Sequence, residues 1–177
     1  LTHSTRLGWR YMSIHGKRPG TDYDSETNIF LSLFSESLRR LNPDETVDEA
    51  TVQAVLDHLR NDLSAEDVGR LFYRDLVGGV FGLRLVDFDH PGNNDFTVVT
   101  ELPYEYEDDS FRPDIVFLLN GMPLAFMEVK RENNRDGILA ERDRMHRRFG
   151  QPHYRRFANI TQLMVFSNNQ PYDDEDH

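Results

Sequence analysis

Apolar residues in the first half of the chain recur at the spacing of a helix. A helix is predicted over residues 29–41, with a buried stripe formed by Ile29, Phe30, Leu33, Phe34, Leu38 and Leu41. Asn42-Pro43 should end it, because a residue that precedes proline avoids the helical region. A second helix is predicted from the capping box Thr46-Val-Asp-Glu49. A third is predicted from Ser64-Ala-Glu-Asp67 to Gly78-Gly79, with Val68 on its apolar face.

The second half of the chain changes to the alternating period of strands. Residues 81–88 alternate, and Pro91-Gly-Asn-Asn94 reads as a turn that caps its own backbone. Strict alternation over residues 96–106 predicts one long strand. Apolar runs at 115–119 and 124–129, joined by Asn120-Gly121, predict a hairpin. A helix follows with Ile138, Met145 and Phe149 on one face, and residues 160–166 predict a last buried strand.

This order of elements predicts an α/β fold, with a mixed sheet flanked by helices and a helical N-terminal half. We expect a single domain over residues 1–177, with a helical part at about 1–80 and the sheet at about 81–170. The first residues contain neither a methionine nor a helix cap, so the chain is expected to be a fragment of a longer protein.

Composition narrows the class of protein. The chain has no cysteine, which excludes disulfides and thiolate zinc sites and favours a reducing cytoplasm. No apolar run reaches transmembrane length. The net charge of -11 opposes strong binding to DNA, but residues 130–156 hold nine Lys or Arg residues against four acids. Arg142, Arg144, Arg147 and Arg148 are therefore candidate DNA contacts, and the alternative for this segment is a solvated helix face.

Three charged side chains stand out at the open end of the predicted apolar hairpin. Asp114 begins one strand, and Glu128 and Lys130 end the other. Charges at a buried sheet need partners, so these three should face one another or a cation. Two carboxylates suit Mg²⁺, and the Val129 carbonyl is a possible third ligand. Such a site could hydrolyse phosphodiesters, with Lys130 stabilising the transition state or positioning the attacking water. The alternative is a salt-bridged hairpin end.

The chain resembles the PD-(D/E)xK nucleases, and in particular the N-terminal nuclease domain of the type I restriction enzyme R subunit. The matching segments are Leu7-Gly-Trp9, Leu41-Asn-Pro43, Asn93-Asn-Asp-Phe96, Arg112-Pro-Asp114, Glu128-Val-Lys130 and Gln162-Leu-Met-Val-Phe-Ser-Asn168. The resemblance implies Mg²⁺-dependent cleavage of double-stranded DNA. It also implies an ATP-driven helicase motor in the same polypeptide and a complex with methyltransferase and specificity subunits. The chain lacks a Gly-x-x-x-x-Gly-Lys-Ser/Thr motif, so the motor would lie outside it.

The chain departs from the family pattern on the helix after the lysine. The family carries Gln-x-x-x-Tyr there, whereas this chain has Met145 and Phe149 at the nearest matching spacing, so the polar half of the motif is expected to be lost. Two alternative functions remain open at this stage. One is a catalytically silent docking module, and the other is a repair or resolvase nuclease of the same superfamily.

Strand parity gives the proposed site a geometric requirement. A regular two-residue turn at Asn120-Gly121 would pair Asp114 with Met127 and turn Glu128 to the opposite face of the sheet. We therefore expect a three-residue loop or a β-bulge between Asp114 and Glu128. The seven histidines show no pair at ligand spacing on one predicted element, so no histidine metal site is predicted.

Overall fold

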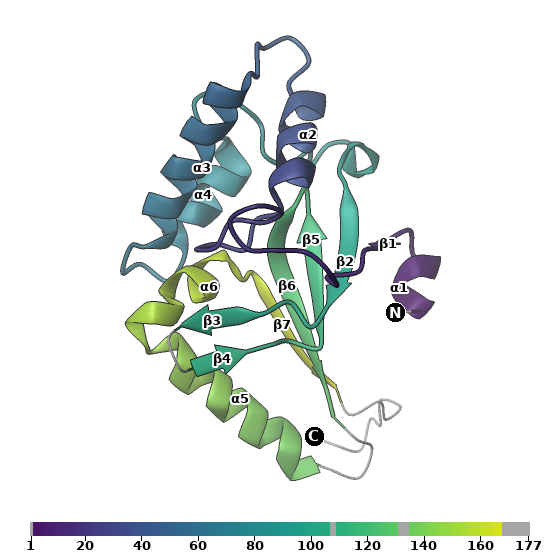
Figure 1. The fold of residues 1–177 in the computed structure, drawn as a ribbon, viewed down its shortest axis with the longest axis vertical. Coiled ribbons are helices and arrows are strands. Elements are labelled where there is room, and N and C mark those ends of the chain that lie inside the picture. The colour runs from purple at the N-terminus through teal and green to yellow at the C-terminus, as the bar shows by residue number, and fades with distance from the viewer. Residues whose placement is uncertain (1, 107–108, 131–134, 168–177) are drawn as a thin grey trace.

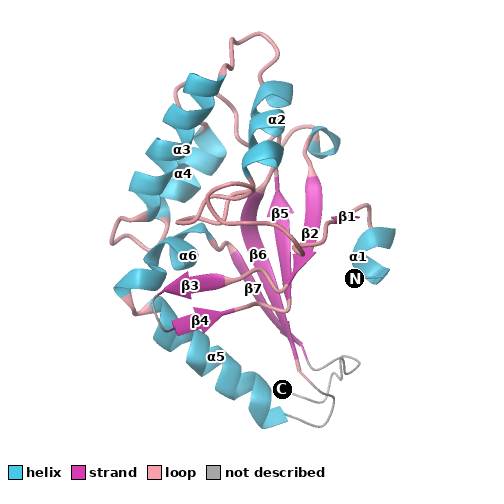
Figure 2. Cartoon of the chain, viewed as in Figure 1, coloured by secondary structure: helices cyan, strands magenta, loops and turns pink. Residues whose placement is uncertain are grey.

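The computed structural model describes residues 2–106, 109–130 and 135–167 as a mixed α/β fold (Figures 1 and 2). Its helices are α1 (Thr2–Arg6), α2 (Leu31–Leu41), α3 (Glu49–Leu63), α4 (Arg70–Gly78), α5 (Arg135–Phe149) and α6 (Arg155–Ile160), with short 3-10 turns η1 (Pro91–Asn93) and η2 (Pro152–Tyr154). Its strands are β1 (Arg10–Tyr11), β2 (Phe96–Thr100), β3 (Tyr104–Tyr106), β4 (Asp109–Phe111), β5 (Ile115–Leu119), β6 (Met122–Val129) and β7 (Leu163–Ser167). None of these helices has the length and apolar composition needed to cross a membrane.

A mixed five-stranded sheet forms the centre, in the order β1-β2-β5-β6-β7. β2, β5 and β6 are antiparallel neighbours, while β1 and β7 pair in parallel at the two edges. β3 and β4 form a separate hairpin. Helices α2, α3 and α4 lie together beyond one end of the sheet, and α5 runs beside β7 near the other (Figure 1). The predicted mixed sheet and the helical N-terminal half are thus confirmed.

The N-terminal helices form where the periodicity predicts them, but two of their starts differ. The cap of α3 is Asp48, whose carboxylate accepts the Thr51 N–H, so the capping box predicted at Thr46 is wrong. Helix α4 begins at Arg70, after Gly69 in a left-handed conformation, rather than near Ser64. Val68 is 94% exposed with φ 58°, so it does not belong to the apolar face of α4. The predicted ends at Asn42 and Gly78-Gly79 are confirmed.

Three predicted strands need correction. Residues 81–88 form no strand, although Leu83 and Leu85 are buried, and only one isolated bridge joins Val80 to Leu83. The long strand predicted over 96–106 is two strands in different sheets, broken where Glu101 takes φ 55° ahead of Pro103. The last strand begins at Leu163, because the residues up to Ile160 form α6 instead.

The β5–β6 hairpin carries the predicted irregularity. Asn120 and Gly121 form its turn with φ of 52° and 81°, as two-residue hairpin turns require, and Leu119 pairs with Met122. The register shifts between Phe117 and Leu118, which pair with Ala125 and Pro123. Leu124 is the extra residue of this β-bulge. The expectation of a bulge between Asp114 and Glu128 is confirmed.

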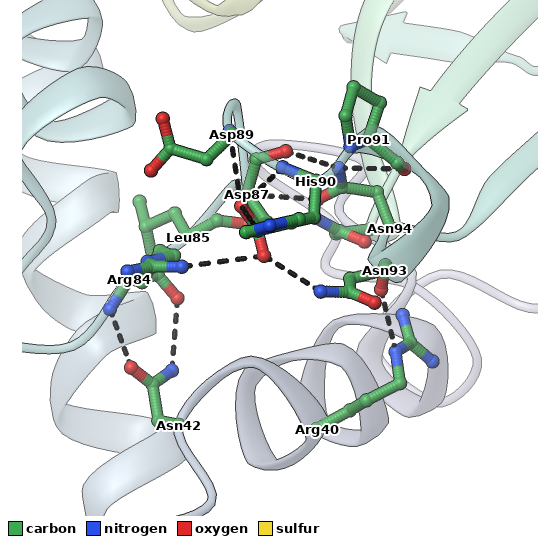
Figure 3. Close-up of polar contacts among 11 residues, drawn as sticks. Arg40, Asn42, Arg84, Leu85, Asp87, Asp89, His90, Pro91, Asn93 and Asn94 are labelled. Carbon is green, nitrogen blue, oxygen red and sulfur yellow. Dashed lines mark hydrogen bonds and ion pairs between the residues drawn. The ribbon is translucent and has the colours of Figure 1, made fainter.

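The turn of this hairpin is anchored by amides. Asn120 Nδ2 donates to the Leu85 carbonyl and to Asn94 Oδ1, each at 2.9 Å, and the Asp95 N–H donates to Asn120 Oδ1 at 2.8 Å. Asn94 in turn bonds both the N–H and the carbonyl of Asp87, as Figure 3 shows. Asn94 Nδ2 also donates to the Pro91 carbonyl at 3.1 Å, so the predicted turn that caps its own backbone is confirmed, and the bond from Asn120 to Asn94 joins it to the closed end of the hairpin.

Hydrophobic clusters lie on both sides of this hairpin. The first joins α2, α3 and α4 to Met122 and Ile160, with Leu119 and Leu124 packed against it. The second contains Val116, Phe126, Met145 and Phe157, and so links one face of β5 and β6 to α5 and α6. The candidate site lies at the open end of the hairpin on this second face, because Asp114 and Glu128 share the parity of Val116 and Phe126.

Candidate active site

Asp114, Glu128 and Lys130 come together at the open end of the β5–β6 hairpin. Ile115 pairs with Met127, so the next pair outward places Asp114 opposite Glu128. Asp114 Oδ2 accepts the Val129 N–H at 2.7 Å, which ties its carboxylate to the segment between Glu128 and Lys130. Without the extra residue Leu124, Glu128 would point to the other face of the sheet.

Glu128 has a buried carboxylate whose surroundings disfavour the charged form. It is 5% exposed, and its Oε1 has no hydrogen-bond partner among the residues that the structure describes. Burial raises the pKa of Glu128, and the nearby charge of Asp114 raises it further, against the opposing effect of Lys130. A buried carboxylate oxygen without a hydrogen-bond partner lowers the stability of the fold. Asp114 and Glu128 could therefore hold a cation between them.

Lys130 lies between two carboxylates. Its Nζ is 3.3 Å from Glu128 Oε2 and 3.0 Å from Glu141 Oε2. Burial alone would lower the pKa of Lys130, but contact with Glu141 and Glu128 outweighs burial and the pKa is raised. The ammonium group is therefore held charged and in a fixed place.

Glu141 also lies in the candidate site, although it was not predicted from the sequence. It lies on α5, is 4% exposed, and contacts both Lys130 and Arg144 at 3.0 Å. The sequence predicts the family's Gln-x-x-x-Tyr pattern at Met145 and Phe149, with its polar half lost. The structure instead puts a polar side chain in the site one turn before the fully buried Met145. The i, i+4 spacing of Glu141 and Met145 was the available signal.

The four candidate DNA-binding arginines of α5 have different surroundings. Arg144 pairs with Glu141 next to the site, and the guanidinium of Arg148 lies 4.5 Å from the centre of the Phe111 ring. Arg142 and Arg147 are exposed, and both donate hydrogen bonds to Asp143, Arg142 to its carboxylate and Arg147 to its carbonyl. The structure thus brings Arg144 to the site and leaves Arg142 and Arg147 on the outer surface of the helix.

Comparison with known proteins supports the resemblance. The family model described as the type I restriction enzyme R protein N terminus matches residues 1–172. The chain is 32% identical over 149 residues to the HindI type I restriction enzyme endonuclease subunit of Haemophilus influenzae, an alignment that covers 70% of the chain and 13% of that protein.

A second relative comes from an archaeon. The chain is 29% identical over 145 residues to MjaIXP, a candidate type I restriction enzyme endonuclease subunit of Methanocaldococcus jannaschii, with 70% of the chain and 14% of that protein covered. The chain therefore spans about a seventh of the length of these relatives.

Proposed function

Because the chain belongs to the family of type I restriction enzyme R protein N termini, we propose that its sheet carries a Mg²⁺-dependent DNA endonuclease centre of the PD-(D/E)xK type. Asp114 and Glu128 are its metal ligands, and Lys130 is its cationic catalytic residue. The observation that carries the proposal is Glu128 Oε1, a buried oxygen without a hydrogen-bond partner among the described residues, on the carboxylate opposite Asp114.

A hard divalent cation fits this pair of acids. Mg²⁺ prefers oxygen ligands and is commonly held by one or two protein carboxylates together with water. Asp114 and Glu128 supply the carboxylates. The Val129 carbonyl is the third proposed ligand, because the hydrogen bond from the Val129 N–H to Asp114 Oδ2 holds this residue beside the carboxylates. Bound there, Mg²⁺ would supply positive charge to the phosphate oxygens and make a water molecule more acidic.

Lys130 is proposed to face the scissile phosphate. Its raised pKa keeps the ammonium group charged at neutral pH, and Glu128 and Glu141 hold it in place before substrate binds. A cation fixed in advance stabilises the charge that develops on the phosphate without costly reorganisation. The same group is close enough to Glu128 to position the attacking water beside the metal ligands.

The substrate and partners in this proposal follow from the family. The relatives are named as endonuclease subunits of type I restriction enzymes, so double-stranded DNA is the proposed substrate. An ATP-driven helicase motor would occupy part of the polypeptide that lies outside this chain. Methyltransferase and specificity subunits are the proposed partners of the whole protein.

The affinity for Mg²⁺ should separate the metal ligands from the lysine. We expect Asp114→Asn and Glu128→Gln each to weaken Mg²⁺ binding by about tenfold or more, because each removes a charged oxygen ligand. Lys130→Met should bind Mg²⁺ at least as tightly as the wild type, because it removes a neighbouring positive charge. Isothermal titration calorimetry with MgCl₂ measures all three affinities.

Glu49→Gln is the matched control for this experiment, because Glu49 is an exposed carboxylate that also pairs with a cation, Arg39. Its affinity should equal that of the wild type. Equal Mg²⁺ affinities in the wild type, Asp114→Asn and Glu128→Gln would remove the assignment of these two residues as ligands.

Binding of DNA to α5 gives a second test. We expect the double variant Arg142→Gln/Arg147→Gln to bind duplexes of all sequences more weakly. The slope of log affinity against log salt should fall by about two, since each lost phosphate contact contributes roughly 0.9. Fluorescence anisotropy over a series of salt concentrations that begins low is the measurement, because an acidic chain should bind DNA weakly. Arg70→Gln on α4 is the control, and an unchanged slope in the double variant would make these arginines solvated surface residues.

A further inference from the structure

Helices α3 and α4 bring a histidine and two aspartates together. His58 and Asp62 lie one helical turn apart on α3, and Asp75 projects from α4. His58 Nε2 is 2.7 Å from Asp75 Oδ2 and 3.6 Å from Asp62 Oδ2. One nitrogen or oxygen atom from each of the three residues lies within 4.8 Å of the others. Three potential metal ligands from two helices therefore converge.

The two carboxylates of this cluster contact each other. Burial and a hydrogen bond with Asp75 raise the pKa of Asp62. Arg74 lies 3.2 Å from Asp62 and 2.9 Å from Asp75, but 62% of its side chain is exposed. The cluster thus joins two acids and an imidazole to one cation that can move into solvent. A divalent cation would relieve the repulsion between the acids more completely.

We propose that His58, Asp62 and Asp75 form a transition-metal site that takes Zn²⁺ and clamps α3 to α4. One imidazole nitrogen and two carboxylate oxygens are ligands that Zn²⁺ accepts, whereas Mg²⁺ favours oxygen alone. Ligand atoms about 2.0 Å from a tetrahedral Zn²⁺ stand roughly 3.3 Å apart. The distances from His58 Nε2 to the carboxylate oxygens of Asp75 and Asp62, 2.7 and 3.6 Å, lie on either side of this value. Arg74 would withdraw and leave the fourth position to water.

The site has an aromatic neighbour and lies away from the proposed Mg²⁺ centre. The ring of Phe81 lies 5.2 Å from the His58 imidazole, centre to centre, and limits its movement. Helices α3 and α4 lie at the upper left of Figure 1, whereas the end of β6 and α5 lie at the bottom. The Zn²⁺ site and the proposed Mg²⁺ centre therefore share no element, and either can be removed without touching the other's ligands.

Zinc titration tests the proposal in a background that lacks the catalytic carboxylates. In the Asp114→Asn/Glu128→Gln variant, calorimetry with ZnCl₂ should still find one tight equivalent. Adding His58→Gln or Asp62→Asn to this variant should weaken Zn²⁺ binding by about tenfold or more. Removing a metal ligand should lower the affinity at least as much as removing a residue that only orients a ligand. His90→Gln is the matched control, because His90 also lies beside an aspartate, Asp87 at 3.8 Å, and forms no second carboxylate pair among the residues that the structure describes.

Thermal unfolding provides the second readout. Zn²⁺ should raise the melting temperature of the background variant and of His90→Gln, and should leave that of His58→Gln unchanged. Circular dichroism without metal checks that His58→Gln, whose parent side chain is 30% exposed, still folds. Absence of a Zn²⁺ equivalent would overturn the proposal. An equivalent that persists at full affinity in His58→Gln and Asp62→Asn would overturn it as well.

Discussion

Replacing Lys130 by alanine is expected to lower DNA cleavage by the intact subunit about 100- to 1,000-fold while ATP hydrolysis continues at the wild-type rate. The ammonium group is charged, fixed between Glu128 and Glu141, and close to the proposed metal ligands. Its loss would remove the proposed stabilisation of the transition state. Cleavage of supercoiled plasmid and release of phosphate from ATP, measured in the same reaction, separate the two activities.

Lys17→Ala is the matched control, because Lys17 is the other lysine of the chain and also pairs with a carboxylate, that of Asp22. It should cleave DNA normally. If Lys130→Ala lost ATP hydrolysis together with cleavage, the residue would act in folding or docking, and the catalytic assignment would fail. Cleavage at the wild-type rate by Lys130→Ala would also reject that assignment.

Gly121→Ala should produce a large loss of stability, about 2–3 kcal/mol. Gly121 has φ +81°, and a Cβ there would lie 2.7 Å from the Phe34 nitrogen and 2.8 Å from the Phe30 carbonyl oxygen. Both atoms belong to the backbone at the start of α2. This backbone already contacts the turn, because the Phe30 N–H donates a hydrogen bond to the Gly121 carbonyl at 2.9 Å. Urea unfolding, with an unchanged dependence on denaturant, measures the loss.

Gly92→Ala is the control for this substitution, because no atom lies within 4 Å of its Cβ position and its φ is not in the left-handed region. It should change the free energy of unfolding little. An equal effect of the two substitutions would show that the close approach of the turn to α2 contributes nothing to stability.

The helices were the most predictable part of the fold, because their signals are local. The apolar stripe of residues 29–41 and the glycine pair Gly78-Gly79 that ends α4 each depend on residues close together in the sequence. The strands were harder to predict. Leu83 and Leu85 alternate with polar residues and are buried, yet they belong to no strand. Alternation shows which side chains are buried, but it does not show whether a neighbouring backbone supplies the hydrogen bonds of a sheet. The break after Thr100 depends on the backbone of Glu101, which alternation does not report.

The candidate site was predictable to the extent that its residues lie in one hairpin. Asp114, Glu128 and Lys130 are conspicuous because charges are rare in an apolar hairpin. Glu141 is not conspicuous, because an acid on an arginine-rich helix reads as a surface residue until packing places it beside Lys130. The same holds for His58, whose partners are aspartates of two helices rather than a second histidine.

The extra residue at Leu124 makes the site sensitive to the length of the hairpin rather than to its composition. Exchanging one apolar residue for another along β5 or β6 changes packing but leaves the direction of Glu128 intact. Deleting a single residue between Leu119 and Glu128 turns every later side chain of β6 to the opposite face of the sheet. The strands could still pair, but Glu128 and Lys130 would no longer lie on the face that carries Asp114. Variation within this hairpin should therefore preserve its residue count far more strictly than its residue identities.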